Sequence, residues 1–202
     1  MPDTENFKPQ LWMVRPDLDG LPPLDLPEGC ELATYGPGSD DDWGRIITAS
    51  FGQEHFFEKT MASDAEFRPE RVFFVMHGGE AVATASAWYD PSIMADAGTL
   101  HYVGALPGHQ GKKLGYWVSL AALHRMVEEG RSRARLQTDD WRLAAIKTYL
   151  NLGFGPFLIH ENQRARWASV FEKLGLPELA ERFAGILTGP VWEKPDGAGG
   201  PA

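Results

Sequence analysis

The fold is decided by the stretch that begins Leu100-His101-Tyr102-Val103-Gly104-Ala105-Leu106 and runs to Phe154. The quoted residues predict an apolar strand that stops at Pro107. The basic turn Gln110-Gly111-Lys112-Lys113-Leu114-Gly115 follows and leads directly into a long helix. A helix N-terminus offers unpaired backbone N–H groups and the positive end of the helix dipole, so it binds phosphate. The segment therefore predicts a cradle for the pyrophosphate of a phosphate-bearing ligand.

The composition limits the class of protein. The chain has 202 residues, 43% of them hydrophobic, which is enough for one core of ordinary size. Its 19 basic and 28 acidic residues give a formal charge of −9, which argues against a nucleic-acid surface. With a single cysteine, no secretory leader and no long apolar run, we expect a cytoplasmic protein that does not bind membranes. The six histidines lack ligand spacing, so no metal site is expected.

The order of the expected elements predicts an α/β (α+β) fold. Short segments near 31–35 and 43–51 are expected to form a strand and a helix, and a hairpin follows around Gly78-Gly79. Strand, helix, strand, helix and strand then alternate over residues 99–160. Antiparallel strands first and β–α–β units second indicate a mixed, mostly antiparallel central sheet with helices on both faces.

Two segments resemble the motifs of the GCN5-related N-acetyltransferase (GNAT) superfamily. The basic turn matches the pattern [Gln/Arg]-x-x-Gly-x-[Gly/Ala], except that Lys113 stands where the family usually has glycine, and a Cβ there restricts the backbone. Residues 142–154 match Asn-x-x-Ala-x-x-x-Tyr-x-x-x-Gly-Phe, except that Arg142 replaces the asparagine. Both motifs occur at suitable spacing, and the resemblance covers about residues 30–160.

The resemblance implies an N-acetyltransferase that moves an acetyl group from acetyl-coenzyme A to a primary amine by direct attack in a ternary complex. It implies that the pantetheine arm pairs with the backbone of Val103, Gly104 and Ala105, where Gly104 leaves room for close approach. A backbone N–H of this strand would polarise the thioester carbonyl. Arg142 would reach a phosphate or a pantetheine carbonyl. The pyrophosphate would be held by Gln110, Gly111, Lys112, Lys113, Leu114 and Gly115.

The same resemblance suggests catalytic residues. Tyr149 is the candidate donor to the leaving thiolate, with a buried core tyrosine as the alternative. His101 is the candidate base, and strand alternation is expected to place it on one face with Thr99 and Val103. A histidine hydrogen-bonded within the sheet is equally compatible with the pattern. Rival bases are Glu54, His55, Glu58 and Asp90, and the expected acceptor-binding residues are Glu54, His55 and Trp88, with Tyr89, Phe56, Phe57 and Trp141 as further aromatic candidates.

The expected organisation is one GNAT-like domain with extensions. Its parts are an extended N-terminal arm at 1–29, the domain at 30–160, a helical extension at 161–194 and a disordered tail at 195–202. We expect the acceptor to be a small-molecule or peptide amine, whose identity the sequence does not indicate. The helices near 163–187 are expected either to close the acceptor pocket or to form a homodimer through Trp167, Val170, Phe171 and Leu174.

Two other functions fit parts of the sequence. A catalytically silent acyl-coenzyme A-binding sensor or assembly module would explain the departures at Lys113 and Arg142. An unrelated protein that binds ATP or NAD would use the basic turn for nucleotide phosphates. The chain lacks Gly-x-x-x-x-Gly-Lys-[Ser/Thr], and no Gly-x-Gly-x-x-Gly follows its opening strand, which disfavours the second.

Overall fold

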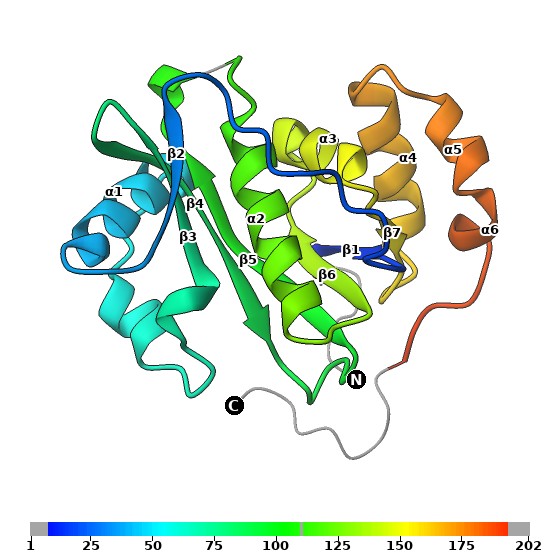
Figure 1. Ribbon diagram of the computed structural model, residues 1–202. Coiled ribbons are helices and arrows are strands. Elements are labelled where there is room, and N and C mark those ends of the chain that lie inside the picture. Colours follow the sequence, from blue (N-terminus) through cyan, green and yellow to red (C-terminus); the bar gives the residue numbers. More distant parts are fainter. Residues whose placement is uncertain (1–7, 110, 194–202) are drawn as a thin grey trace. The chain divides into compact units, whose positions relative to one another are not determined.

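The computed structural model describes residues 8–109 and 111–193 (Figure 1). The chain divides into two compact units. One unit is Pro16–Ala134, and the other combines the residues up to Arg15 with those from Arg135 onward. Gln110, the expected tail at 195–202 and the first seven residues of the expected arm lie outside the described residues.

The unit Pro16–Ala134 contains four antiparallel strands in the order β2-β3-β4-β5. Gly78 and Gly79 join β3 to β4 with φ values of 61° and 83°, as the expected two-residue hairpin turn requires. The strands are β2 (Cys30–Thr34), β3 (Val72–His77), β4 (Glu80–Tyr89) and β5 (Ala97–Ala105), and three short turns accompany them: η1 (Glu58–Ala62), η2 (Pro69–Arg71) and η3 (Pro107–His109).

Two helices, α1 (Ser39–Phe51) and α2 (Leu114–Glu128), cover opposite faces of these strands (Figure 1). A Cβ on Gly98 would come within 2.5 Å of Met126 on α2. A Cβ on Gly104 would instead come within 2.9 Å of Ile47 and 2.8 Å of Ser50 on α1. The expectation of an antiparallel sheet with helices on both faces is confirmed for this unit.

Helix α1 shows how the sequence forms this layer. Its first turn carries Asp40, Asp41 and Asp42, which suit the positive end of the helix dipole. It ends at Gly52, whose left-handed conformation lets its N–H donate to the carbonyl of Thr48. Its apolar positions recur every three to four residues and pack on β4 and β5. The buried cluster contains Trp43, Ile46, Ile47, Phe57, Met61, Val72, Phe74, Ala81 and Trp88.

A β-bulge interrupts β5 at Tyr102. Thr84 lies opposite Gly104 while Ser86 lies opposite His101, so three steps on β5 face two on β4. Tyr102 has a left-handed φ of 44°, which is rare for a residue other than glycine. The extra residue reverses the alternation of faces along the strand. The expectation that His101 and Val103 share a face is therefore wrong: His101 shares the α1 face with Gly104.

The other unit contains a strand that no local sequence pattern indicates. β1 (Leu11–Arg15) pairs antiparallel with β7 (Gly155–Phe157), and Leu11 and Met13 are fully buried. This part of the expected N-terminal arm is therefore core rather than surface. The remaining elements of the unit are β6 (Arg133–Thr138), which begins two residues before its boundary, α3 (Leu143–Asn151), α4 (Gln163–Lys173), α5 (Glu178–Arg182) and α6 (Ala184–Leu187).

Helix α4 does not offer the expected dimer surface. Trp167, Val170 and Phe171 are at most 1% exposed, because they form the core under α4, and Phe171 stacks on Phe183. The expected dimer contacts through Trp167, Val170 and Phe171 are therefore wrong, since an apolar residue already buried within its own chain cannot contact a second copy. Leu174 is half-buried, and a homodimer that uses other residues stays a prediction. Among the helices of the described residues, none is long and apolar enough to cross a bilayer.

We expect the substitution Gly104→Ala to lower the free energy of unfolding by about 1–3 kcal/mol, because the added methyl overlaps Ile47 and Ser50. Urea denaturation measures the change. Gly108→Ala is the matched control: a Cβ there meets no atom within 4 Å, so a change below about 0.5 kcal/mol is expected. Equal effects of the two substitutions would contradict the packing of α1 against Gly104.

Candidate functional site

The turn that precedes α2 has the geometry expected for an anion site. Gly111 and Lys113 both have left-handed backbones, with φ values of 84° and 53°. Lys113 is the N-cap of α2 and makes no side-chain cap hydrogen bond, and the first turn of the helix carries no acidic residue. A Cβ on Gly111 or Gly115 would meet no atom within 4 Å, so space remains beside the turn. The residues present therefore fit a phosphate group.

Lys113, at the position where the family motif has glycine, has a left-handed backbone. A residue with a Cβ adopts this conformation at a cost of about 1–2 kcal/mol, whereas glycine adopts it readily. The lysine therefore adds backbone strain at this position. Leu114 is buried under the helix, so only its backbone faces the turn.

Lys112 is held from the end of β3. Its Nζ donates a hydrogen bond to Nε2 of His77 at 2.5 Å, and the His77 ring contacts that of His109, with ring centroids 5.3 Å apart. These contacts collect three basic side chains beside the turn. His77 was not found from the sequence, because it lies 35 residues from Lys112 and no local pattern connects them.

The end of β5 offers fewer free amides than expected. The N–H of Ala105 donates to Oγ of Ser50 at 3.0 Å, and this hydroxyl donates to the carbonyl of Ile46 at 2.8 Å. The missing side chain of Gly104 makes room for α1, so the expectation that it makes room for the cofactor arm is wrong on that face. Val103 remains as the candidate whose N–H could polarise a carbonyl.

The structure brings together three of the residues expected at the base and acceptor sites. The ring of His101 lies 5.6 Å from that of Trp88 and 4.5 Å from that of Tyr102 (centroid distances). The ring of His55, which follows α1 in the chain, lies 5.7 Å from that of Tyr102 on the same face. Tyr102 was missed from the sequence because strict alternation would place it opposite His101.

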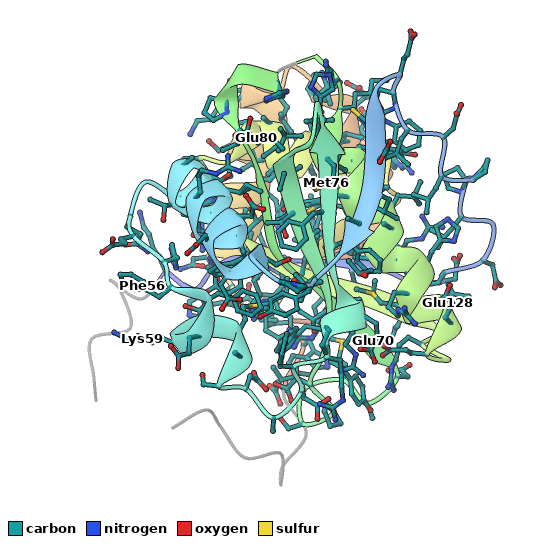
Figure 2. The ribbon with its side chains drawn as sticks, turned by 60° about the vertical axis from the view of Figure 1, so that its left-hand side comes forward. Phe56, Lys59, Glu70, Met76, Glu80 and Glu128 are labelled. Atoms are coloured by element: carbon teal, nitrogen blue, oxygen red, sulfur yellow. The ribbon has the colours of Figure 1, made fainter. Side chains whose placement is uncertain are left out.

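The other acceptor candidates lie elsewhere. Glu54 and Glu58 are exposed. Phe56 is 51% exposed at the outer side of the η1 segment, beside Lys59 (Figure 2). Asp90 accepts hydrogen bonds from the N–H and hydroxyl of Ser92, as expected of a turn residue. Of the three remaining aromatic candidates, Trp141 is exposed and Phe57 is buried in the α1 core. The third, Tyr89, donates from its hydroxyl to the carbonyl of Ala95 at 2.9 Å.

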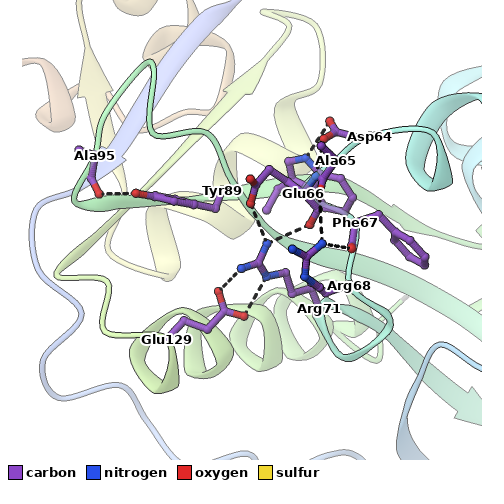
Figure 3. Close-up of polar contacts among 10 residues, drawn as sticks. Asp64, Ala65, Glu66, Phe67, Arg68, Arg71, Tyr89, Ala95 and Glu129 are labelled. Carbon is purple, nitrogen blue, oxygen red and sulfur yellow. Dashed lines mark hydrogen bonds and ion pairs between the residues drawn. The ribbon is translucent and has the colours of Figure 1, made fainter.

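A buried arginine fixes the segment that carries Asp64 (Figure 3). Arg71 binds both carboxylate oxygens of Glu129 at 2.8–2.9 Å and donates to the carbonyl of Glu66 at 2.9 Å. Burial alone would lower the pKa of the Arg71 guanidinium, but the hydrogen bond and charge of Glu129, then those of Glu66, raise it. Asp64, held in this segment, accepts a hydrogen bond from Nε1 of Trp88 at 3.2 Å.

The two remaining site candidates belong to the other unit. Tyr149 on α3 is 7% exposed and lies edge-on to Phe154, with ring centroids 6.2 Å apart. Burial raises the pKa of Tyr149 to about 12, against the opposing charge of Arg142. Arg142 precedes α3, donates from Nε to Asp139 at 3.1 Å and packs on the Trp141 ring.

No group of three or more histidine, cysteine or acidic side chains in the described part of the chain could hold a metal ion. The arrangement that the structure does show is a helix N-terminus suited to an anion and a strand whose His101 lies beside aromatic rings.

The comparisons with known proteins agree with this arrangement. Residues 41–154 match the model of the acetyltransferase (GNAT) family. A mycothiol acetyltransferase of Nocardia farcinica is 30% identical over 73% of this chain and 53% of its own length. One of Kytococcus sedentarius is 30% identical over 71% of this chain and 53% of its own length. The chain thus spans about half the length of these curated relatives.

Solved structures share the fold. A GCN5-related N-acetyltransferase from Sphaerobacter thermophilus matches with a TM-score of 0.57 at 19% identity, over 74% of this chain and 49% of that chain. The ribosomal-protein-S18-alanine N-acetyltransferase from Escherichia coli matches with a TM-score of 0.52 at 22% identity, over 62% of this chain and 77% of that chain. The predicted α/β fold with a mostly antiparallel sheet is confirmed.

We expect Lys113→Gly to raise the free energy of unfolding by about 0.5 kcal/mol. Glycine relieves about 1–2 kcal/mol of left-handed strain and gives back part of it through its freer unfolded chain. The opposite exchange, Gly111→Ala, should lower it by about 1 kcal/mol, since only backbone strain is added there. Urea denaturation without ligand measures both. A loss of stability in Lys113→Gly would mean that the lysine side chain, not the backbone, decides this position.

Proposed function

The chain belongs to the acetyltransferase (GNAT) family, and from that premise we propose that it transfers an acetyl group from acetyl-coenzyme A to a primary amine. The observation that carries the proposal is the turn before α2, where left-handed Gly111 and Lys113 open a helix with no acidic residue in its first turn. Gly111, Lys112, Lys113 and the backbone of Leu114 and Gly115 would hold the pyrophosphate. Gln110 belongs to the proposed set but lies outside the described residues. Bound acetyl-coenzyme A supplies an activated acetyl thioester.

The acceptor we propose is a small-molecule amine. The curated relatives are named mycothiol acetyltransferases, which favours a small molecule over a protein. An alkylammonium group has a pKa of about 10 and must lose a proton before it attacks. His101 is the group we propose to accept that proton, and its position beside Trp88 and Tyr102 on the α1 face supports this role.

The chain's own groups account for the remaining steps. The N–H of Val103 is proposed to stabilise charge that develops on the carbonyl oxygen. Tyr149 is proposed to donate a hydrogen bond to the leaving thiolate. Its pKa of about 12 lies well above that of an ordinary thiol, about 8.5, so a hydrogen bond is favoured over full transfer of the proton. Arg142 is proposed to bind a phosphate or a pantetheine carbonyl through its guanidinium group.

The proposed activity is tested with a panel of primary amines: an amino sugar, amino acids, a polyamine, an aromatic amine and a lysine peptide. We expect at least one amine to cause release of free thiol from acetyl-coenzyme A, and calorimetry to show binding of coenzyme A. Binding without turnover on any amine would favour the silent acyl-coenzyme A sensor. Stabilisation by NAD or ATP instead of coenzyme A would overturn the proposal.

Tyr149→Phe should lower kcat by about a hundredfold, the usual loss when one donor to a developing anion is removed. Affinity for coenzyme A should change little, because the phenyl ring still fills the buried site. Since the pKa of Tyr149 is about 12, its hydroxyl stays protonated up to pH 10, and its ionisation should not limit the rate below that pH. Steady-state rates from pH 6 to 10 measure both effects. Unchanged kcat would make Tyr149 a core residue only.

A further inference from the structure

Tyr102 lies in an unfavourable backbone conformation at the middle of the site strand. It is one of two residues in the described chain, with Lys113, that combine a side chain with a left-handed φ. A strained residue of this kind persists only where its surroundings hold it, and such residues concentrate at functional sites. Lys113 is accounted for by the turn before α2. The bulge lies next to Val103, whose N–H is proposed to polarise the carbonyl, but no proposed step uses the Tyr102 side chain.

The bulge determines what the Tyr102 ring touches. In a regular strand His101 and Tyr102 would point to opposite faces. Because the bulge inserts one residue, both rings lie on the α1 face, with centroids 4.5 Å apart and planes at 77°. The Tyr102 ring also contacts two rings of α1, Trp43 and Phe51, with centroid distances of 5.1 Å and 5.8 Å. Helix α1 therefore packs against the Tyr102 ring.

The Tyr102 ring contacts two imidazoles. The His101 ring lies edge-on to it with centroids 4.5 Å apart, and the His55 ring lies edge-on to it with centroids 5.7 Å apart. His55 is anchored by its backbone N–H, which donates to Oγ1 of Thr48 at 3.2 Å. Burial raises the pKa of Tyr102, so at neutral pH it is an uncharged ring beside two groups that can each carry a proton.

We propose that Tyr102 is a positioning residue for the acceptor side of the site, whose ring sets the orientation and spacing of His55 and His101. The inference rests on the proposed acetyl transfer, in which an imidazole first takes a proton from the acceptor ammonium. The neutral amine then attacks the thioester carbonyl and forms the amide bond, while the carbon–sulfur bond breaks and coenzyme A leaves as the thiol with the second proton lost by the nitrogen. The strained backbone is retained because a regular strand would turn the ring away from both histidines. The titratable groups around the Tyr102 ring are Tyr102 itself and His101 on β5, and His55 and Glu54 after α1. Asp64 is linked to this group by its hydrogen bond from Trp88, whose ring contacts that of His101.

Two substitutions separate the ring from the backbone. Tyr102→Gly removes the ring and relieves the left-handed strain, whereas Tyr102→Phe keeps the ring and the strain. Rates are measured with acetyl-coenzyme A and the panel amine that wild type acetylates fastest, from pH 5.5 to 9. For Tyr102→Gly we expect kcat to fall about tenfold or more and the acid limb of the pH–rate profile to move. For Tyr102→Phe we expect both within about twofold of wild type.

The binding of coenzyme A, measured by calorimetry, is the control for folding and should stay within about twofold of wild type in both variants. If Tyr102→Gly keeps the wild-type kcat and pH profile, or if Tyr102→Phe loses as much as the glycine variant, the positioning role is overturned. If Tyr102→Gly fails to fold, Tyr102→Asn takes its place, since asparagine tolerates a left-handed backbone and also lacks the ring.

A second measurement separates this inference from the proposed function. The imidazole signals of His55 and His101 are recorded by NMR in all variants without any acceptor. We expect both signals to move in Tyr102→Gly and to stay near wild type in Tyr102→Phe. If wild type acetylates no amine, the proposed function fails, while the NMR result still decides whether the ring orders the two histidines. Unmoved signals in the glycine variant would overturn the inference.

Discussion

One extra residue in β5 is the constraint on which the rest of the site depends. The bulge at Tyr102 reverses the alternation of faces, so His101 and Gly104 both face α1. Gly104 then lets α1 approach until Ser50 binds the N–H of Ala105, and this contact fixes the end of the strand. The same reversal brings the Tyr102 ring beside His101. Packing and the arrangement of polar groups therefore have a common origin in one backbone irregularity.

Much of the fold could be predicted because its signals are local. The Gly78-Gly79 turn, the acidic first turn of α1 and its glycine stop each act within a few residues, and each is present in the structure. β1 was missed for the opposite reason. Its Leu11–Arg15 segment lies among prolines and pairs with β7, more than 140 residues away, so its strand character comes from a partner that no local pattern shows.

The candidate site also contains parts that local sequence patterns predict and parts that depend on distant residues. The turn before α2 could be predicted because helix-terminus chemistry depends on consecutive residues, and Lys113 has the left-handed backbone that glycine adopts readily. Tyr102, Ser50 and His77 could not be predicted. Tyr102 depends on a register shift, and Ser50 and His77 act on residues 55 and 35 positions away. Contacts of this kind form only when the chain has folded, so no local sequence pattern indicates them.

The two left-handed side-chain residues differ in what the chain gains from them. At Lys113 a glycine would serve the turn equally well. The Lys113 side chain makes no capping hydrogen bond, so no contact of that kind accompanies the backbone strain. At Tyr102 the ring has four ring neighbours, two of them imidazoles, so the strain is coupled to the arrangement of groups that can accept protons. A glycine at this position would suit the left-handed backbone but would remove the ring that contacts both imidazoles. Backbone strain is therefore informative about function only where the side chain it orients touches chemically active groups.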